Sequence, residues 1–159
     1  MIWHDVERHA QQVDAVLARA KQAAVTESPE LQADLARYAC VLVAGYVEQS
    51  VKSIFGEFVR TRASTEVHRY AERRLARVRN LNANDLAALA GDFNPAWRVS
   101  LDLVLQDERK AALDSVVANR NVIAHGRSVG IGIVQIGTYH GQVKNVIKEL
   151  ALITGVLAS

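Results

Sequence analysis

Hydrophobic residues recur at intervals of three and four positions along most of this chain, a spacing typical of helices that each bury one face. In the first segment, from about Trp3 to Val25, the spacing places Val6, Val13 and Leu17 on one stripe. Good helix formers, above all Ala, Leu, Arg, Gln and Glu, also dominate the rest of the chain. The pattern therefore predicts a protein built from amphipathic helices.

The second segment carries two signals of a helix start. Ser28 suits the N-cap, and Pro29 suits the first helical position, where its missing N–H costs nothing. This helix is expected to run to about Arg62, and its middle, "YACVLVAGYVEQSVKSIFGEFV", is apolar nearly all round, as in the central helix of a bundle. Gly45 and Gly56 inside it predict close approach by another helix.

Further helical segments follow, separated by caps and breaks. They are a basic helix that starts near Ser64 or Thr65, a short helix within residues 80–97, a helix opened by Asn94 and Pro95, and a helix capped by Asp107 and ended by Gly126.

Residues 128–141, "SVGIGIVQIGTYHG", depart from the helical pattern, because they combine four glycines with β-branched residues on alternate positions. A lone strand would have no partner in the chain, so a loop is favoured over a strand. A last amphipathic helix then starts at about His140. The predicted fold is an all-α, up-and-down bundle of about five to six helices, with a glycine-rich loop before the last helix.

Composition limits the class of protein further. The 159 residues, 50% of them hydrophobic and 23% charged, predict one domain over 1–159. The single cysteine, Cys40, excludes an internal disulfide, and no signal peptide or apolar run long enough for a membrane span is evident, which predicts a cytoplasmic protein without a membrane partner. The five histidines show no HxxxH spacing and there is no CxxC, so neither a metal nor a cofactor is predicted.

Positive charge is concentrated in one place although the net charge is only +2. The run "RYAERRLARVR" holds Arg69, Arg73, Arg74, Arg77 and Arg79. Two interpretations are open: a solvated helix face, or a surface that follows the phosphates of a nucleic acid.

Glu48 stands out because it interrupts the apolar middle of the second helix. An ionised carboxylate is costly to desolvate without a partner. Glu48 lies either on a wet edge of the helix beside Gln49 and Lys52, or where it orients an arginine or histidine.

The stretch "ANRNVIAHGRS" contains a second anomaly. At about 100° per residue, Arg120 falls in the middle of an apolar arc about 120° wide. That arc consists of Leu113, Val116, Val117, Ile123 and Ala124. Because a guanidinium keeps its charge, Arg120 needs a partner there: an internal ion pair, with Glu48 as one candidate, a subunit interface, or a pocket open to an anionic ligand.

His125 has an ordinary interpretation beside a functional one. A histidine at the end of a helix usually satisfies the helix dipole. On an ideal helix it lies about 140° away from Arg120. The two side chains would meet only if the helix frayed at Gly126 or a partner chain brought them together.

The run Arg120-Asn121-Val122-Ile123-Ala124-His125 resembles the signature of the HEPN superfamily, in which an Arg, a polar residue, a few mostly apolar residues and a His end a late helix of a small all-α bundle. The long apolar helix around "YACVLVAGY" is similar to the early helix of the RiboL-PSP-HEPN subgroup. The resemblance implies a metal-independent endoribonuclease that forms a homodimer, in which the Arg and His of both chains line one cleft. Arg120 and His125 match the catalytic pair, and Asn121 matches the polar residue.

The chemistry of RNA cleavage suits these side chains. A neutral imidazole, here His125, can deprotonate the 2′-OH, and Arg120 can stabilise the charge on the phosphorane-like transition state. Asn121 could hold the phosphate or fix the histidine tautomer, while Glu48 is assigned only on physical grounds as a supporting residue. Further contacts to RNA are expected from Arg73, Arg74, Arg77 and Arg127.

One position departs from the resemblance. In HEPN toxins paired with a minimal nucleotidyltransferase antitoxin, a Tyr two residues after the His receives the neutralising AMP, and here that position is Arg127. Control by this chemistry is not expected, whereas a toxin held by a protein antitoxin or a stand-alone phage-defence nuclease stays open. The alternative is a non-catalytic HEPN-like module that binds nucleotide, nucleic acid or a protein partner, and a third reading is a helical scaffold in which Arg120 forms a structural ion pair.

Overall fold

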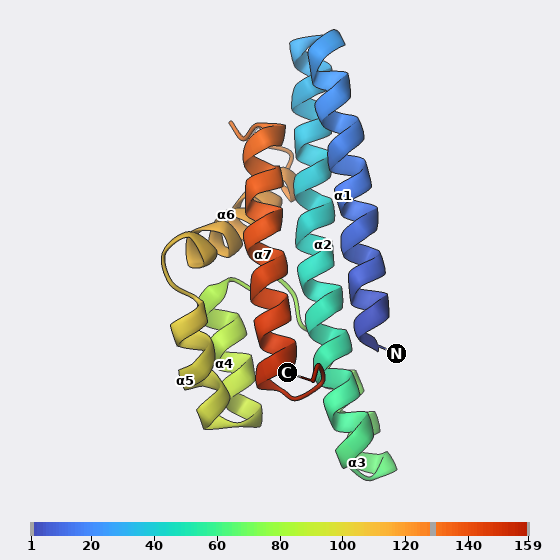
Figure 1. The fold of residues 1–159 in the computed structure, drawn as a ribbon, viewed down its shortest axis with the longest axis vertical. Coiled ribbons are helices and arrows are strands. Elements are labelled where there is room, and N and C mark those ends of the chain that lie inside the picture. The colour runs from blue at the N-terminus through green and yellow to red at the C-terminus, as the bar shows by residue number, and fades with distance from the viewer. Residues whose placement is uncertain (1, 128–129, 159) are drawn as a thin grey trace.

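A computed structural model describes residues 2–127 and 130–158, and all regular structure within them is helical. In chain order the helices are α1 Ile2–Thr26, α2 Pro29–Arg62, α3 Thr65–Leu75, α4 Ala83–Phe93, α5 Pro95–Val104, α6 Asp107–Ala124 and α7 Ile133–Ile153 (Figure 1). The all-α prediction is confirmed, with seven helices in the described residues rather than five to six. None of these helices is both long and apolar enough to cross a membrane.

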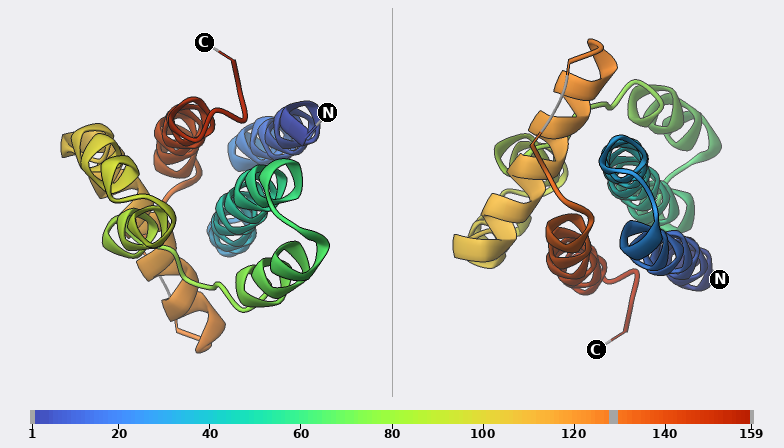
Figure 2. Two further views of the ribbon diagram at one scale, coloured as in Figure 1. Left: turned by 90° about the horizontal axis from the view of Figure 1, so that it is seen from below. Right: turned by 90° about the horizontal axis from the view of Figure 1, so that it is seen from above.

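The three long helices, α1, α2 and α7, run side by side and make the body of the bundle (Figure 1). The shorter α4 and α5 pair with each other beside one end of α7, and α3 folds back against α2. Seen along the bundle, α6 crosses it obliquely and packs on both α2 and α7 (Figure 2). This crossing carries the C-terminal end of α6 to the same side of α2 as α3.

Four helices begin at a capping side chain, and two of these caps, Ser28 and Asn94, were predicted from the sequence. The side chains of Ser28, Ser64, Asn82 and Asn94 each accept a hydrogen bond from a backbone N–H in the first turn of α2, α3, α4 and α5. The prediction for α6 was wrong, because Gln106 occupies its N-cap and no side chain caps the helix. Asp107 is instead the first helical residue, with a positive φ of 48°.

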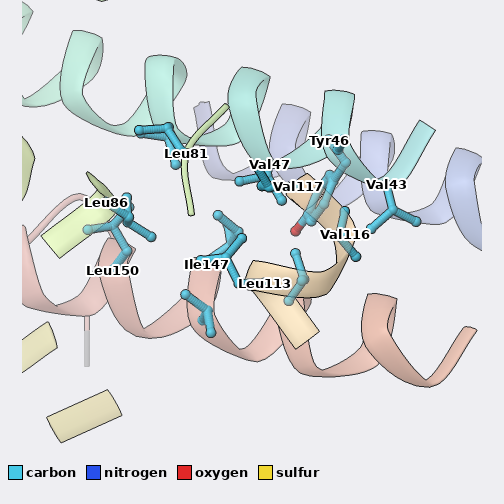
Figure 3. Packing of buried hydrophobic residues seen from close by; sticks show 14 of the residues in the cluster. Val43, Tyr46, Val47, Leu81, Leu86, Leu113, Val116, Val117, Ile147 and Leu150 are labelled. Atoms are coloured by element: carbon cyan, nitrogen blue, oxygen red, sulfur yellow. The ribbon is translucent and has the colours of Figure 1, made fainter. Parts of the chain in front are cut away.

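The core forms around the middle of α2, where α1, α6 and α7 all pack. Figure 3 shows Val43 and Val47 of α2 converging with Leu113 and Val116 of α6 and with Ile147 of α7. Each of these side chains is almost completely buried. The apolar circumference of α2 is therefore explained by neighbours on several sides, as expected for a central helix.

Cys40 belongs to this core. Its side chain is fully buried, and burial raises the pKa of its thiol to about 11. The thiol is therefore protonated at neutral pH and serves as a small apolar group.

The glycine-rich loop is shorter than predicted. The last helix begins at Ile133 instead of about His140, so Gly137 and Gly141 lie inside it. Ile136, His140 and Val143 are buried on one face, and this burial outweighs the helix cost of about 1 kcal/mol for each glycine. The prediction erred because the polar His140 hides the helical stripe. Of the expected loop, residues 128 and 129 lie outside the described part.

The expectation for Gly45 and Gly56 was also wrong. A Cβ atom at either position would meet no atom within 4 Å, apart from its own helix. Neither glycine is required by close contact with another helix.

Candidate functional site

The end of α6 is a well-formed helix stop. Gly126 has a φ of 73°, its N–H donates to the carbonyl of Ile123 at 2.9 Å, and the N–H of Arg127 donates to the carbonyl of Val122 at 3.1 Å. These two bonds make the glycine-terminated turn that satisfies the last carbonyls of a helix. The stop at Gly126 therefore agrees with the sequence.

This stop determines how the motif residues are arranged. The N–H of His125 still donates to the carbonyl of Asn121, at 3.2 Å, so the helix is not frayed before Gly126. Arg120 and His125 therefore keep an angular separation close to the roughly 140° of an ideal helix. His125 occupies the C-cap with an exposed side chain, whereas Arg120 is half-buried. Within one chain the two side chains therefore leave α6 on different faces.

Arg120 is held by amide oxygens. Its Nη1 donates to the Oδ1 of Asn80 at 3.1 Å and, more weakly, to the Oδ1 of Asn121 at 3.5 Å. Among the described residues no carboxylate lies within ion-pair distance of this guanidinium. The direct Glu48–Arg120 ion pair considered from the sequence is therefore absent, and the charge of Arg120 faces only neutral acceptors.

Glu48 reaches Arg120 through one intermediate residue. Its Oε1 accepts a hydrogen bond from the backbone N–H of Asn80 at 3.0 Å. The side chain of the same Asn80 accepts from Arg120. A carboxylate on α2 thus anchors the loop residue that positions the guanidinium on α6.

Asn80 is the residue that the sequence analysis missed. It lies in the connection between α3 and α4 with a φ of 54°, a left-handed conformation that Asn tolerates better than most residues. Its carbonyl also accepts the N–H of Asn82, which caps α4. The run "RNLNAND" signals a turn with a left-handed position, but the partner on α6, forty residues later, leaves no trace in local sequence.

Two open hollows flank the motif. One, of about 310 Å³, has Asn121, Asn82 and Lys110 in its lining. The other, of about 440 Å³, is lined by Arg37, Tyr38, Val41, Ile123, Gly126 and Arg127. Asp114 also lines the first hollow, and its carboxylate pairs with Lys110. The end of α6 therefore offers neutral amides beside an internally paired charge on one side, and a mixed apolar and basic surface on the other.

The arginines of α3 and of the turn that follows it do not join the Arg120 network. Arg73, Arg74 and Arg77 are exposed, and no ion pair involves them in the part of the chain that the structure describes. The guanidinium of Arg74 lies 6.0 Å from the centre of the Tyr70 ring. Figure 2 shows α3 and the end of α6 on the same side of α2, and Figure 1 shows that α3 and α6 lie at different levels along the bundle.

No cluster of three or more His, Cys, Asp or Glu side chains that could hold a metal ion occurs in residues 2–127 and 130–158.

Comparison with protein families gave one match. The sequence model of the family described as RiboL-PSP-HEPN matches residues 10–154, which include most of α1 and all later helices. Comparisons with curated proteins and with solved structures gave no match.

Proposed function

Because the chain belongs to the RiboL-PSP-HEPN family, whose members carry a HEPN-type domain, we propose that it is a metal-independent endoribonuclease with a site completed by a second copy of the chain. The observation that carries the proposal is the state of Arg120. A permanently charged group, half-buried and oriented by two neutral amide oxygens, keeps its charge available for an anion. A phosphodiester is the anion that this family context favours.

The reaction divides between two side chains. The neutral imidazole of His125 takes the proton of the 2′-OH, the 2′-oxygen forms a bond to phosphorus, and the bond from phosphorus to the 5′-oxygen breaks. Arg120 donates to the non-bridging oxygens, whose negative charge grows in the transition state. A proton from a second acid or from water goes to the leaving 5′-oxygen, and the products are a 2′,3′-cyclic phosphate and a 5′-OH.

A second copy is needed because one chain keeps the two groups apart. The surface beside the motif suits an interface, since Tyr38 is 55% exposed and Val41 is 41% exposed, and both line the same hollow as Ile123 and Arg127. A two-fold axis near this surface would place Arg120 of one chain beside His125 of the other. Covering the apolar side chains would also stabilise the dimer.

The polar residues around Arg120 take supporting roles in this proposal. Asn80 is a positioning residue, because it accepts from Arg120 without neutralising it, and Glu48 fixes the backbone of Asn80. Asn121 lines the neighbouring hollow and can donate its amide to the phosphate. Arg127, Arg73 and Arg74 of α3, and Arg77 in the turn after α3 would guide the RNA strand by a salt-dependent attraction.

The biological role that fits such an enzyme is that of a toxin or a phage-defence effector. Arg127 occupies the position of the tyrosine that receives AMP in related toxins. A partner that inhibits this protein would therefore act by binding to it and not by transferring AMP to that position.

A second candidate function is a HEPN module that binds RNA, a nucleotide or a protein without cutting RNA. The same separation of Arg120 and His125 within one chain favours it, since a monomer has no assembled pair. The two candidates differ in whether cleavage occurs and in whether the protein associates.

The test uses purified full-length protein, EDTA and a labelled single-stranded RNA. We expect cleavage to products that end in a 2′,3′-cyclic phosphate, and none with the same strand carrying 2′-O-methyl groups. Arg120→Ala and His125→Ala should each lower the rate at least about a hundredfold. Circular dichroism serves as the control for an intact helical fold. Unchanged cleavage in both variants, or RNA binding without any cleavage, would reject the proposal.

A further inference from the structure

The helix α3 leaves much of its apolar stripe open. Val67 is 55% exposed and Tyr70 is 65% exposed, although both follow the same three-and-four spacing as Ala71 and the buried Leu75. Elsewhere in the bundle, as on α1, such a stripe is mostly buried against a neighbouring helix. The apolar side of α3 is therefore only half covered by this chain.

The open stripe forms one wall of a groove. Between α3, the end of α2 and α4 lies a hollow of about 510 Å³ with a mostly apolar lining. Its lining includes Val59, Val67, Tyr70, Val78, Leu89 and Phe93. Its dimensions and composition match a surface for side chains of a partner, not a solvated helix face.

The border of the groove carries an excess of positive charge. Arg74 and Arg77 line it, and Asp92 is the one acidic residue in its lining. Residues 64–79 contain five arginines and two glutamates, and Glu72 lies 3.4 Å from the Nε2 of His68. An occupant would therefore gain from negative charge beside its apolar face.

We propose that this groove binds an acidic amphipathic helix of a second protein. The spacing of Val67, Tyr70, Ala71 and Leu75 matches the three-and-four pattern by which one helix packs along another, and the arginines match acidic residues beside that seam. RNA fits less well, because nucleobases need partners for their polar edges and most of the lining is aliphatic, although a base could stack on Tyr70. A second copy fits less well too. The exposed apolar residues of α5, Val99 and Leu103, lie beside the acidic Asp102, but its carboxylate is already near the guanidinium of Arg98 and so offers little free negative charge to the arginines of the groove.

This inference does not depend on ribonuclease activity. Tyr70 and Val67 make no contact with the Arg120 network, and binding can be measured with no RNA present. Arg74 and Arg77 occur in both proposals, so Tyr70 is the better residue to test.

The probe is a 21-residue peptide made of three Leu-Glu-Glu-Leu-Leu-Glu-Glu repeats, with a Lys-for-Glu peptide as the charge control. We expect the acidic peptide to shift the amide resonances of α3 and α4 in the full-length protein, and the basic peptide to leave them unchanged. Tyr70→Glu should weaken binding by about tenfold or more, because it places a charge at the centre of the interface. Val99→Glu is the matched control, since it adds the same charge at a similarly exposed apolar position on α5.

Four results would overturn the proposal. The first three are equal binding of the acidic peptide to wild type and Tyr70→Glu, occupation of the groove by a ten-nucleotide 2′-O-methyl RNA in preference to the peptide, and burial of the groove by self-association that Tyr70→Glu abolishes. The fourth is the absence of any binding by the acidic peptide. None of these outcomes depends on whether the protein cleaves RNA.

Discussion

Two polar clusters lie on nearly opposite sides of α2, and they differ in what they can do. The inner cluster consists of Tyr46 and Ser50 on α2, Asp14 on α1, and His140 and Lys144 on α7. The outer cluster consists of Glu48, Asn80, Arg120 and Asn121. Tyr46 and Glu48 are two positions apart and therefore project about 160° from each other around α2.

The inner cluster is buried at its histidine and tyrosine, and its Asp14–Lys144 ion pair lies at the surface. His140 is 1% exposed, and burial lowers the pKa of its imidazole to about 4, so the ring is neutral at neutral pH. Its Nε2 lies 3.3 Å from Asp14, but that carboxylate also binds the ammonium of Lys144 at 2.9 Å. The ring packs against the edge of Tyr46, whose pKa burial raises to about 12. These groups are arranged to stay uncharged or internally paired.

The outer cluster is partly open, and its arginine carries a charge that no carboxylate neutralises within the described residues. The comparison shows that burial of a polar side chain does not by itself mark a functional site. What distinguishes the outer cluster is a permanent charge, held in one orientation and reachable from solvent. Substitutions that affect one cluster and spare the other test this distinction.

The largest effect is expected from Arg120→Lys. The substitution keeps the charge but loses the planar fork, so we expect the rate of RNA cleavage to fall about a hundredfold with little change in the melting temperature. Single-turnover kinetics measure the rate, and Arg19→Lys on the exposed face of α1 is the matched control. Wild-type activity in Arg120→Lys would mean that a point charge is sufficient and that the oriented fork has no role.

The inner cluster should respond to pH instead. Since the folded pKa of His140 is about 4 and the unfolded value is 6.5, the unfolded state binds more protons between these values. The free energy of unfolding should therefore fall as the pH is lowered from about 6.5 to 4, by about 3 kcal/mol from this residue. Urea titrations at several pH values measure the loss, and His140→Leu should flatten it. Parallel curves for wild type and His140→Leu would show that His140 does not titrate as its burial requires.

A smaller effect is expected at the proposed interface. Tyr38→Glu places a charge on the exposed apolar surface next to the motif, so the dimer dissociation constant should rise by about tenfold to thirtyfold. Sedimentation measures the association, and diluted enzyme should lose activity sooner than wild type. If Tyr38→Glu associates as wild type does, the interface lies elsewhere.

The smallest effect is expected from a substitution that separates the role of the Asn80 side chain from that of its backbone. Asn80→Gly keeps the left-handed backbone and the N–H that Glu48 accepts, but removes the side chain that holds Arg120. We expect about a tenfold lower cleavage rate and unchanged stability, together with faster rotation of the Arg120 guanidinium in NMR spectra. Unrestricted rotation already present in wild type would contradict a positioning role for Asn80.

Local patterns in the sequence were sufficient for most of the fold. The caps at Ser28 and Asn94, the helix start near Ser64 or Thr65 and the stop at Gly126 depend on neighbouring residues, and the structure agrees with all four. The start of α7 was misjudged because its buried stripe includes His140, whose packing against Tyr46 comes from a distant helix.

The candidate site could be predicted only in part, because its contacts also join residues that are far apart in the sequence. Arg120 is conspicuous because a charge in an apolar arc violates a local rule. Its actual partner, Asn80, is an ordinary turn residue whose importance depends on tertiary contacts to α2 and α6. Glu48 could be singled out from the sequence, but not the bond through Asn80 that connects it to the arginine.

The most direct test of the central claim mixes two inactive variants. Arg120→Ala and His125→Ala proteins are combined, allowed to exchange subunits, and assayed on RNA in EDTA. If Arg120 of one chain acts with His125 of the other, about half of the dimers are mixed and each holds one intact pair, so about a quarter of the wild-type activity should return. A mixture as inactive as either variant alone would contradict a site shared between two chains.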